Sequence, residues 1–127
     1  MTIAYWCVLI AIFLPYLFTM YAKYTGSGYN LQVNHAPREF MTQLTGARKR
    51  ADWAQLNMFE ALPGFIGAVI ISHLAGAAQG SIDQLAIAYI ILRIFHGIFY
   101  IADLAVLRTL IWGCSLACII ALFVIAA

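Results

Sequence analysis

Charged and amide side chains recur at helical spacing in a segment that is otherwise apolar. Arg50, Trp53, Asn57 and Glu60 follow one another at steps of three, four and three residues. At about 100° per residue, these side chains fall within an arc of roughly 80° on an α-helix. Guanidinium, amide and carboxylate groups on one helix face can bind a polar ligand through charge and hydrogen bonds. The spacing therefore predicts a helix with one polar face.

A second apolar segment repeats this pattern with Arg93, His96, Tyr100 and Asp103. Charges inside a membrane cost several kcal/mol each, and less when they are paired. We therefore expect the two polar faces to lie against each other. Counting inward along two antiparallel helices at about 1.5 Å per residue predicts three pairs at equal depth, which are Glu60 with Arg93, Arg50 with Asp103, and Asn57 with His96.

The polar faces allow two compatible interpretations. In the structural one, Glu60 and Arg93 neutralise each other inside the bundle. In the functional one, such costly groups mark a binding site. A proton or solute pathway through Glu60, His96 and Arg93 is a third hypothesis, and it is disfavoured because four helices enclose little room for a passage.

Several other kinds of chemistry lack a sequence pattern. No serine or cysteine nucleophile has a base beside it, and neither a glycine-rich phosphate loop nor a metal-ligand spacing is present. Cys7, Cys114 and Cys118 all fall in apolar runs, where a free thiol packs like a small hydrophobic side chain. The net charge of +2 is too small and too localised to indicate a nucleic-acid partner.

The elements that must position these residues are transmembrane helices. Apolar residues make up 65% of the chain and charged residues 9%, against roughly 25% charged in a soluble domain. At about 20 residues per crossing, 127 residues form one all-α domain, an integral membrane four-helix bundle surrounded by lipids. The expected helices span about residues 3–24, 49–75, 82–105 and 107–126.

One long connection, from Thr25 to Arg48, separates the first two helices, and Pro37 and Gly46 frame a short helix within it over residues 36–44. Basic residues gather at the first and third connections, whereas the second, residues 76–84, has none. The positive-inside rule therefore predicts that loops 1 and 3 are cytoplasmic and that both termini lie on the opposite side.

These residues resemble the membrane-associated proteins in eicosanoid and glutathione metabolism, the MAPEG family, in a bacterial type. The resemblance covers nearly the whole chain. It is carried by an ordered set of segments, namely Leu44-Thr45-Gly46, Arg50-Ala51, Ala54-Gln55, Asn57, Glu60, Pro63 with Phe65, Arg93, Tyr100, and Leu107-Arg108 with Trp112. A bacterial member would lie in the inner membrane.

The resemblance implies a homotrimer that, in catalytic members, binds glutathione as co-substrate between adjacent subunits. Arg108 resembles the arginine that activates the thiol, which makes it the candidate catalytic residue. The residues that the resemblance implies for glutathione binding are Arg50, Asn57, Glu60, Arg93 and Tyr100.

Two functions follow from the resemblance. The first is a glutathione transferase or peroxidase that acts on lipophilic electrophiles arriving from the bilayer. The alternative is a non-catalytic lipid-binding or assembly protein on the same scaffold. Trp53 favours the alternative, because many glutathione-using members have an arginine at that position. Tyr100 also stands eight residues before Arg108, against seven in the leukotriene-forming synthase.

Overall fold

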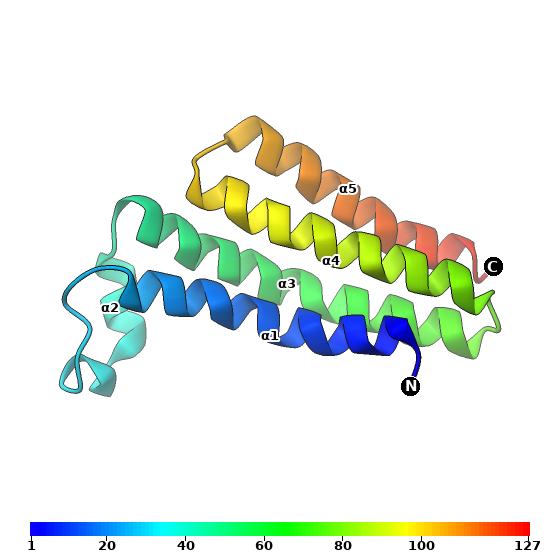
Figure 1. Ribbon diagram of the computed structural model, residues 1–127, viewed down its shortest axis with the longest axis horizontal. Coiled ribbons are helices and arrows are strands. Elements are labelled where there is room, and N and C mark those ends of the chain that lie inside the picture. Colours follow the sequence, from blue (N-terminus) through cyan, green and yellow to red (C-terminus); the bar gives the residue numbers. More distant parts are fainter.

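Four long helices, each antiparallel to the long helix before it in the chain, make up the computed structural model, which describes all residues 1–127 (Figure 1). In chain order the elements are α1 (Ile3–Tyr24), the 3-10 helix η1 (Val33–His35), α2 (Pro37–Gln43), α3 (Gly46–Leu74), α4 (Gln79–Ile101) and α5 (Ala105–Val124). No strand is present, so the all-α prediction is confirmed. The long helices lie within four residues of the spans expected from the sequence, and η1 was not expected.

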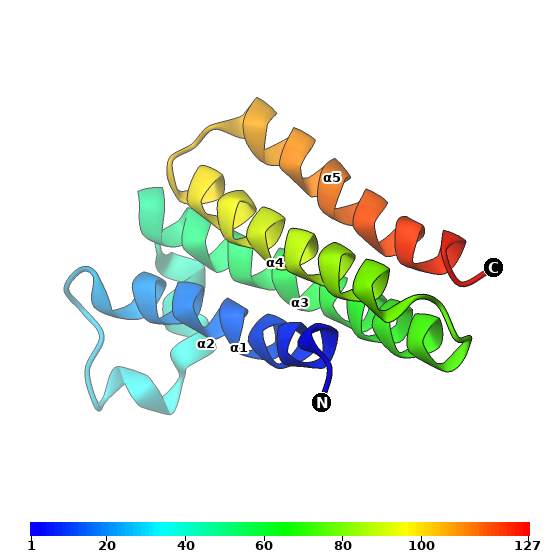
Figure 2. The same ribbon diagram turned by 45° about the vertical axis from the view of Figure 1, so that its right-hand side comes forward.

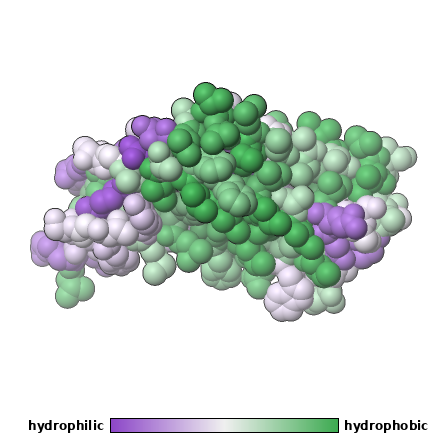
Figure 3. All heavy atoms as spheres, turned by 45° about the horizontal axis from the view of Figure 1, so that its top comes forward, coloured by the Kyte–Doolittle hydropathy of each residue, from purple (hydrophilic) through white to green (hydrophobic).

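The four long helices α1, α3, α4 and α5 are all long and apolar enough to cross a membrane. Large apolar side chains such as Phe13, Leu17, Val106 and Leu110 are exposed along them. Figure 3 shows hydrophobic atoms across the middle of one face and hydrophilic atoms gathered toward its ends. A surface of this kind is stable in lipid rather than in water, so the chain is an integral membrane protein.

Helices α1, α3 and α4 form the packed centre of the bundle, and α5 lies on the side away from α1 (Figures 1 and 2). The largest core cluster includes Phe65 of α3 and Tyr89 of α4, whose rings stack at 3.9 Å between centroids. Only Ser115 and Leu122 of α5 are buried. The Ser72 hydroxyl of α3 lies 2.7 Å from the Leu122 carbonyl oxygen and can donate to it, which ties the C-terminal half of α5 to the core.

The long first connection is held to α1 by a side chain from α3. The Arg48 guanidinium donates to the carbonyl oxygens of Ala22, Lys23 and Ser27 at 2.7, 2.9 and 3.0 Å. Carbonyls at the end of a helix have no partner within it, so these bonds satisfy the C-terminus of α1. This end of the bundle, where α1 ends and α3 begins, also contains the turn between α4 and α5 (Figure 1).

That turn contains Asp103, the only residue other than glycine with a positive φ, at 61°. The amides of Asp103 and Leu104 donate to the carbonyl oxygens of Tyr100 and Phe99, at 3.2 and 2.9 Å. This is the hydrogen-bond pattern of a Schellman motif, in which the left-handed residue ends the helix. It sets the direction in which α5 leaves and therefore the position of Arg108.

Candidate functional site

A pocket of about 160 Å³ lies beside the α4–α5 turn, among α3, α4 and α5. Its lining residues are Asn57, His96, Tyr100, Arg108, Thr109 and Trp112. Three of the six residues predicted for the site, Asn57, Tyr100 and Arg108, thus meet here although they come from three helices. The predicted equal depth of Asn57 and His96 is confirmed, because both side chains line this pocket.

Arg108 occupies the first turn of α5 and is half-buried. Its Cζ atom lies 4.2 Å from the centroid of the Tyr100 ring, a cation–π contact. The chain contains a single ion pair, between Lys49 and Asp52 at 2.9 Å, so no carboxylate neutralises Arg108. No protein group accepts a hydrogen bond from its N–H groups, which are therefore free for a ligand at the pocket.

Aromatic and amide groups complete the wall of the pocket. The rings of His96 and Tyr100 meet edge to face, with centroids 5.5 Å apart. Asn57 reaches the pocket from α3, and its Oδ1 accepts a hydrogen bond from Nη2 of Arg93 at 2.8 Å. Arg93 itself does not line the pocket, because only 2% of its surface is exposed.

The predicted pairing of Glu60 with Arg93 is wrong. No ion pair joins them, and Arg93 bonds to Asn57 instead, one turn nearer the start of α3. Glu60 is exposed on the outside of the protomer. The three residues from Asn57 to Glu60 turn the helix by about 300°, so Glu60 points about 60° away from the side on which Asn57 meets Arg93. The carboxylate of Glu60 therefore points away from Arg93, which the count of residues along the helices did not predict.

Arg50 also lies outside the pocket. Its Nε donates to the carbonyl oxygen of Ile101 at 3.0 Å, so it satisfies a carbonyl at the C-terminus of α4. This contact agrees with the predicted depth of Arg50 near Asp103, although the two residues form no ion pair.

Three pocket residues were absent from the set predicted for the site. His96 belonged to the polar face of α4 but was not assigned to the ligand. Thr109 and Trp112 follow Arg108 at positions i+1 and i+4, so Trp112 shares a helix face with it, and this spacing was the available signal. Trp53 does not line the pocket; it is 46% exposed, and its ring centroid lies 6.5 Å from that of Tyr100.

A second, larger hollow of about 500 Å³ lies among α1, α2 and α3 at the same end of the bundle. Lys23 and Arg38 are its basic residues, and neither has a carboxylate partner. Gln55 lines it from α3, on a different face of that helix from Asn57. No group of three or more His, Cys, Asp or Glu side chains is placed to hold a metal ion anywhere in the chain.

Four membrane-spanning helices with an arginine-bearing pocket near one membrane surface define the class, an integral membrane helical bundle. The MAPEG family model matches residues 3–127, and the chain belongs to the MAPEG family. Membership supports, in general terms, a membrane protein of the glutathione transferase and eicosanoid type. No curated protein and no solved structure matches the chain.

Proposed function

We propose that this protein is a membrane glutathione transferase or peroxidase in which Arg108 stabilises the thiolate of bound glutathione. The observation that carries the proposal is the free guanidinium of Arg108 on a pocket that has donor groups and no carboxylate. A thiolate and the carboxylates of a tripeptide are the groups that such a pocket favours. MAPEG membership supports the choice of glutathione.

In the transferase reaction, the thiol first loses its proton to solvent. The thiolate sulfur then forms a bond to an electrophilic carbon, and the electron pair of the broken bond leaves with the departing group or moves onto the acceptor. Arg108 contributes by favouring the charged sulfur before the attack. In the peroxidase reaction, the same sulfur attacks the terminal oxygen of a hydroperoxide, the O–O bond breaks, and the alkoxide leaves as an alcohol after taking a proton from solvent. The glutathione sulfenic acid that remains condenses with a second glutathione to give the disulfide and water.

The second substrate reaches the pocket from the bilayer. Trp112 and Leu107 are 42% and 46% exposed on the helix that carries Arg108. An apolar acceptor can therefore diffuse in lipid along α5 and meet the sulfur at the pocket without crossing water. The bilayer concentrates lipophilic electrophiles, which makes such substrates the expected class.

The functional unit that we propose is a homotrimer, with glutathione bound between subunits. A volume of about 160 Å³ is below the roughly 300 Å³ at which drug-sized ligand pockets begin, so one protomer offers only part of a site. Glu60 is an exposed carboxylate on a membrane-spanning helix, where contact with lipid is costly. A neighbouring copy that covered Glu60 and completed the wall of the pocket would remedy both features.

For orientation, we propose that the pocket faces the cytoplasm of a bacterial cell, because the Lys and Arg residues gather at this end of the bundle. Glutathione would then enter from the cytoplasmic side of the inner membrane.

The test is a calorimetric titration of glutathione into the purified protein in detergent, followed by a turnover assay with 1-chloro-2,4-dinitrobenzene. Binding together with turnover supports the proposal. Binding of phospholipid or of a lipophilic ligand without any glutathione binding would favour the second candidate, a non-catalytic lipid-binding or assembly protein. The observation that favours this candidate is the exposed indole of Trp53 next to Tyr100, an apolar group at the position where many glutathione-using members have an arginine.

A further inference from the structure

We propose that Arg93 is a positioning residue, which turns the amide of Asn57 so that its Nδ2 hydrogens face the pocket. Arg93 thereby sets the pocket to recognise acceptor atoms and anions, although it does not touch the ligand. The identity of the ligand rests on the function proposed above, whereas the orientation of the amide does not.

The orientation follows from hydrogen-bond chemistry. A guanidinium has N–H donors and no acceptor, so it can bond only to the oxygen of an asparagine amide. Nη2 of Arg93 lies 2.8 Å from Oδ1 of Asn57. The Nδ2 group must then point away from Arg93. No protein atom accepts from Nδ2, and Asn57 lines the pocket whereas Arg93 does not.

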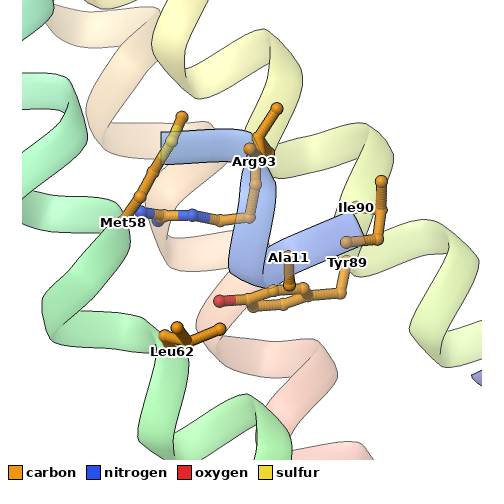
Figure 4. Close-up of a pocket in the computed structure, with 7 residues that line it drawn as sticks. Ala11, Met58, Leu62, Tyr89, Ile90 and Arg93 are labelled. Atoms are coloured by element: carbon orange, nitrogen blue, oxygen red, sulfur yellow. The ribbon is translucent and has the colours of Figure 1, made fainter. Parts of the chain in front are cut away.

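The guanidinium is held in place by the core. Figure 4 shows that it reaches from α4 toward α3 beside Met58, with the Tyr89 hydroxyl directed to the same side. Nη1 is buried without a protein partner, next to a cavity of about 10 Å³ that is also lined by Tyr89. That volume holds about one water molecule, for which Nη1 and the tyrosine hydroxyl are polar partners.

A structural role alone is a poor explanation for this arginine. A buried cation with no carboxylate partner is often less stable than an apolar side chain of similar volume. The Arg93 guanidinium makes only one hydrogen bond to the protein, and its partner is Asn57, which lines the pocket. Because this bond occupies the amide oxygen of Asn57, the amide offers the pocket its N–H donors, beside those of Arg108. No carboxylate lines the pocket.

Two substitutions separate positioning from stability. In Asn57→Asp, one carboxylate oxygen can still accept from Arg93, so the melting temperature should stay equal or rise. The donors are lost and a negative charge faces the ligand, so glutathione affinity should fall by about tenfold or more. In Arg93→Met the amide is free to turn, and affinity should fall by about two- to tenfold because the ligand must order it.

Arg48→Met is the matched control. It also removes a guanidinium, but one that bonds to the carbonyls of Ala22, Lys23 and Ser27 outside the pocket. Its melting temperature should fall while its glutathione affinity stays unchanged. The opposite pattern is expected for Asn57→Asp.

A double-mutant cycle tests whether Arg93 acts through Asn57. Arg93→Met should weaken binding in the unmodified protein but have no further effect in an Asn57→Ala background. An equal loss in both backgrounds would mean that Arg93 acts by its charge or by packing, and that result would overturn the positioning role. Glutathione binding that is unaffected by Arg93→Met would also overturn it while leaving the proposed function intact.

A measurement without ligand covers the case in which glutathione does not bind at all. The chain has three asparagines, Asn30, Asn34 and Asn57, so selective ¹⁵N labelling gives three side-chain amides. The Nδ2 protons of Asn57 should show Overhauser contacts to ring protons of His96 or Tyr100, and these contacts should weaken in Arg93→Met. Overhauser contacts from the Nδ2 protons to the Met58 side chain, which lies beside the Arg93 guanidinium, would contradict the inferred orientation.

Discussion

Replacement of Arg108 by alanine should reduce chemistry far more than stability. In the structure this side chain makes no ion pair and no hydrogen bond, and its one specific contact is the cation–π interaction with Tyr100 at 4.2 Å. Such contacts contribute about 0.5–1 kcal/mol at exposed sites. Arg108→Ala should therefore lower the free energy of unfolding by at most about 1 kcal/mol.

The effect on a thiolate is larger. A positive charge about 4 Å from the sulfur contributes roughly 1 kcal/mol in water and roughly 4 kcal/mol at an effective dielectric constant of 20. The half-buried position of Arg108 lies between these limits. An ordinary thiol titrates near pH 8.5, and lowering its pKa by two units requires about 2.7 kcal/mol. At pH 7, loss of that stabilisation should reduce the thiolate fraction, and with it the turnover, by about tenfold or more.

The assay is a pH–rate profile with glutathione and a hydrophobic acceptor, together with the thiolate absorbance of the bound tripeptide and a melting curve. Because an unassisted thiol ionises above about pH 8.5, the deficit of Arg108→Ala should shrink as the pH rises. Arg108→Lys should recover part of the activity, since it keeps the charge and loses the planar fork. Arg48→Ala should show the reverse behaviour, with a lower melting temperature and an unchanged pH profile. Unchanged turnover in Arg108→Ala at pH 7 would refute this reasoning.

Three further predictions concern the frame around the pocket. Gly97→Ala should destabilise the protein by about 1–3 kcal/mol in thermal melts, because the new Cβ would overlap the ring of Phe18; an unaltered melting temperature would show that α1 and α4 can separate freely. Asp103→Gly should stabilise by about 0.5–1 kcal/mol, since glycine adopts a φ of 61° without strain, and a lower melting temperature would count against this. Cysteines introduced at Ser27 and Ser81, in a background without native cysteines, should label from opposite faces of intact cells, and periplasmic labelling at Ser27 would reverse the proposed orientation.

The amino-acid sequence by itself determined the helices and the depth of the polar residues. Apolar runs of about 20 residues leave few alternatives to membrane spans, because every backbone polar group must be satisfied within lipid. Counting along helices of constant rise then placed Asn57 level with His96 and Arg50 at the end of α4, and both placements agree with the contacts of the structure. The four-residue spacing of Arg108 and Trp112 also indicates which face of α5 lines the pocket.

The tertiary structure decided which of these groups meet. Helical spacing specifies an angle around each axis, but the rotation of a helix within the bundle depends on packing against all its neighbours, such as the stack of Phe65 on Tyr89. That rotation joins Arg93 to Asn57 and leaves Glu60 on the outer surface. A count of residues gives depth alone, so it could not tell whether Asn57 or Glu60 is the partner of Arg93. The position of Arg108 over Tyr100 likewise depends on the left-handed turn at Asp103, because this turn sets the direction of α5.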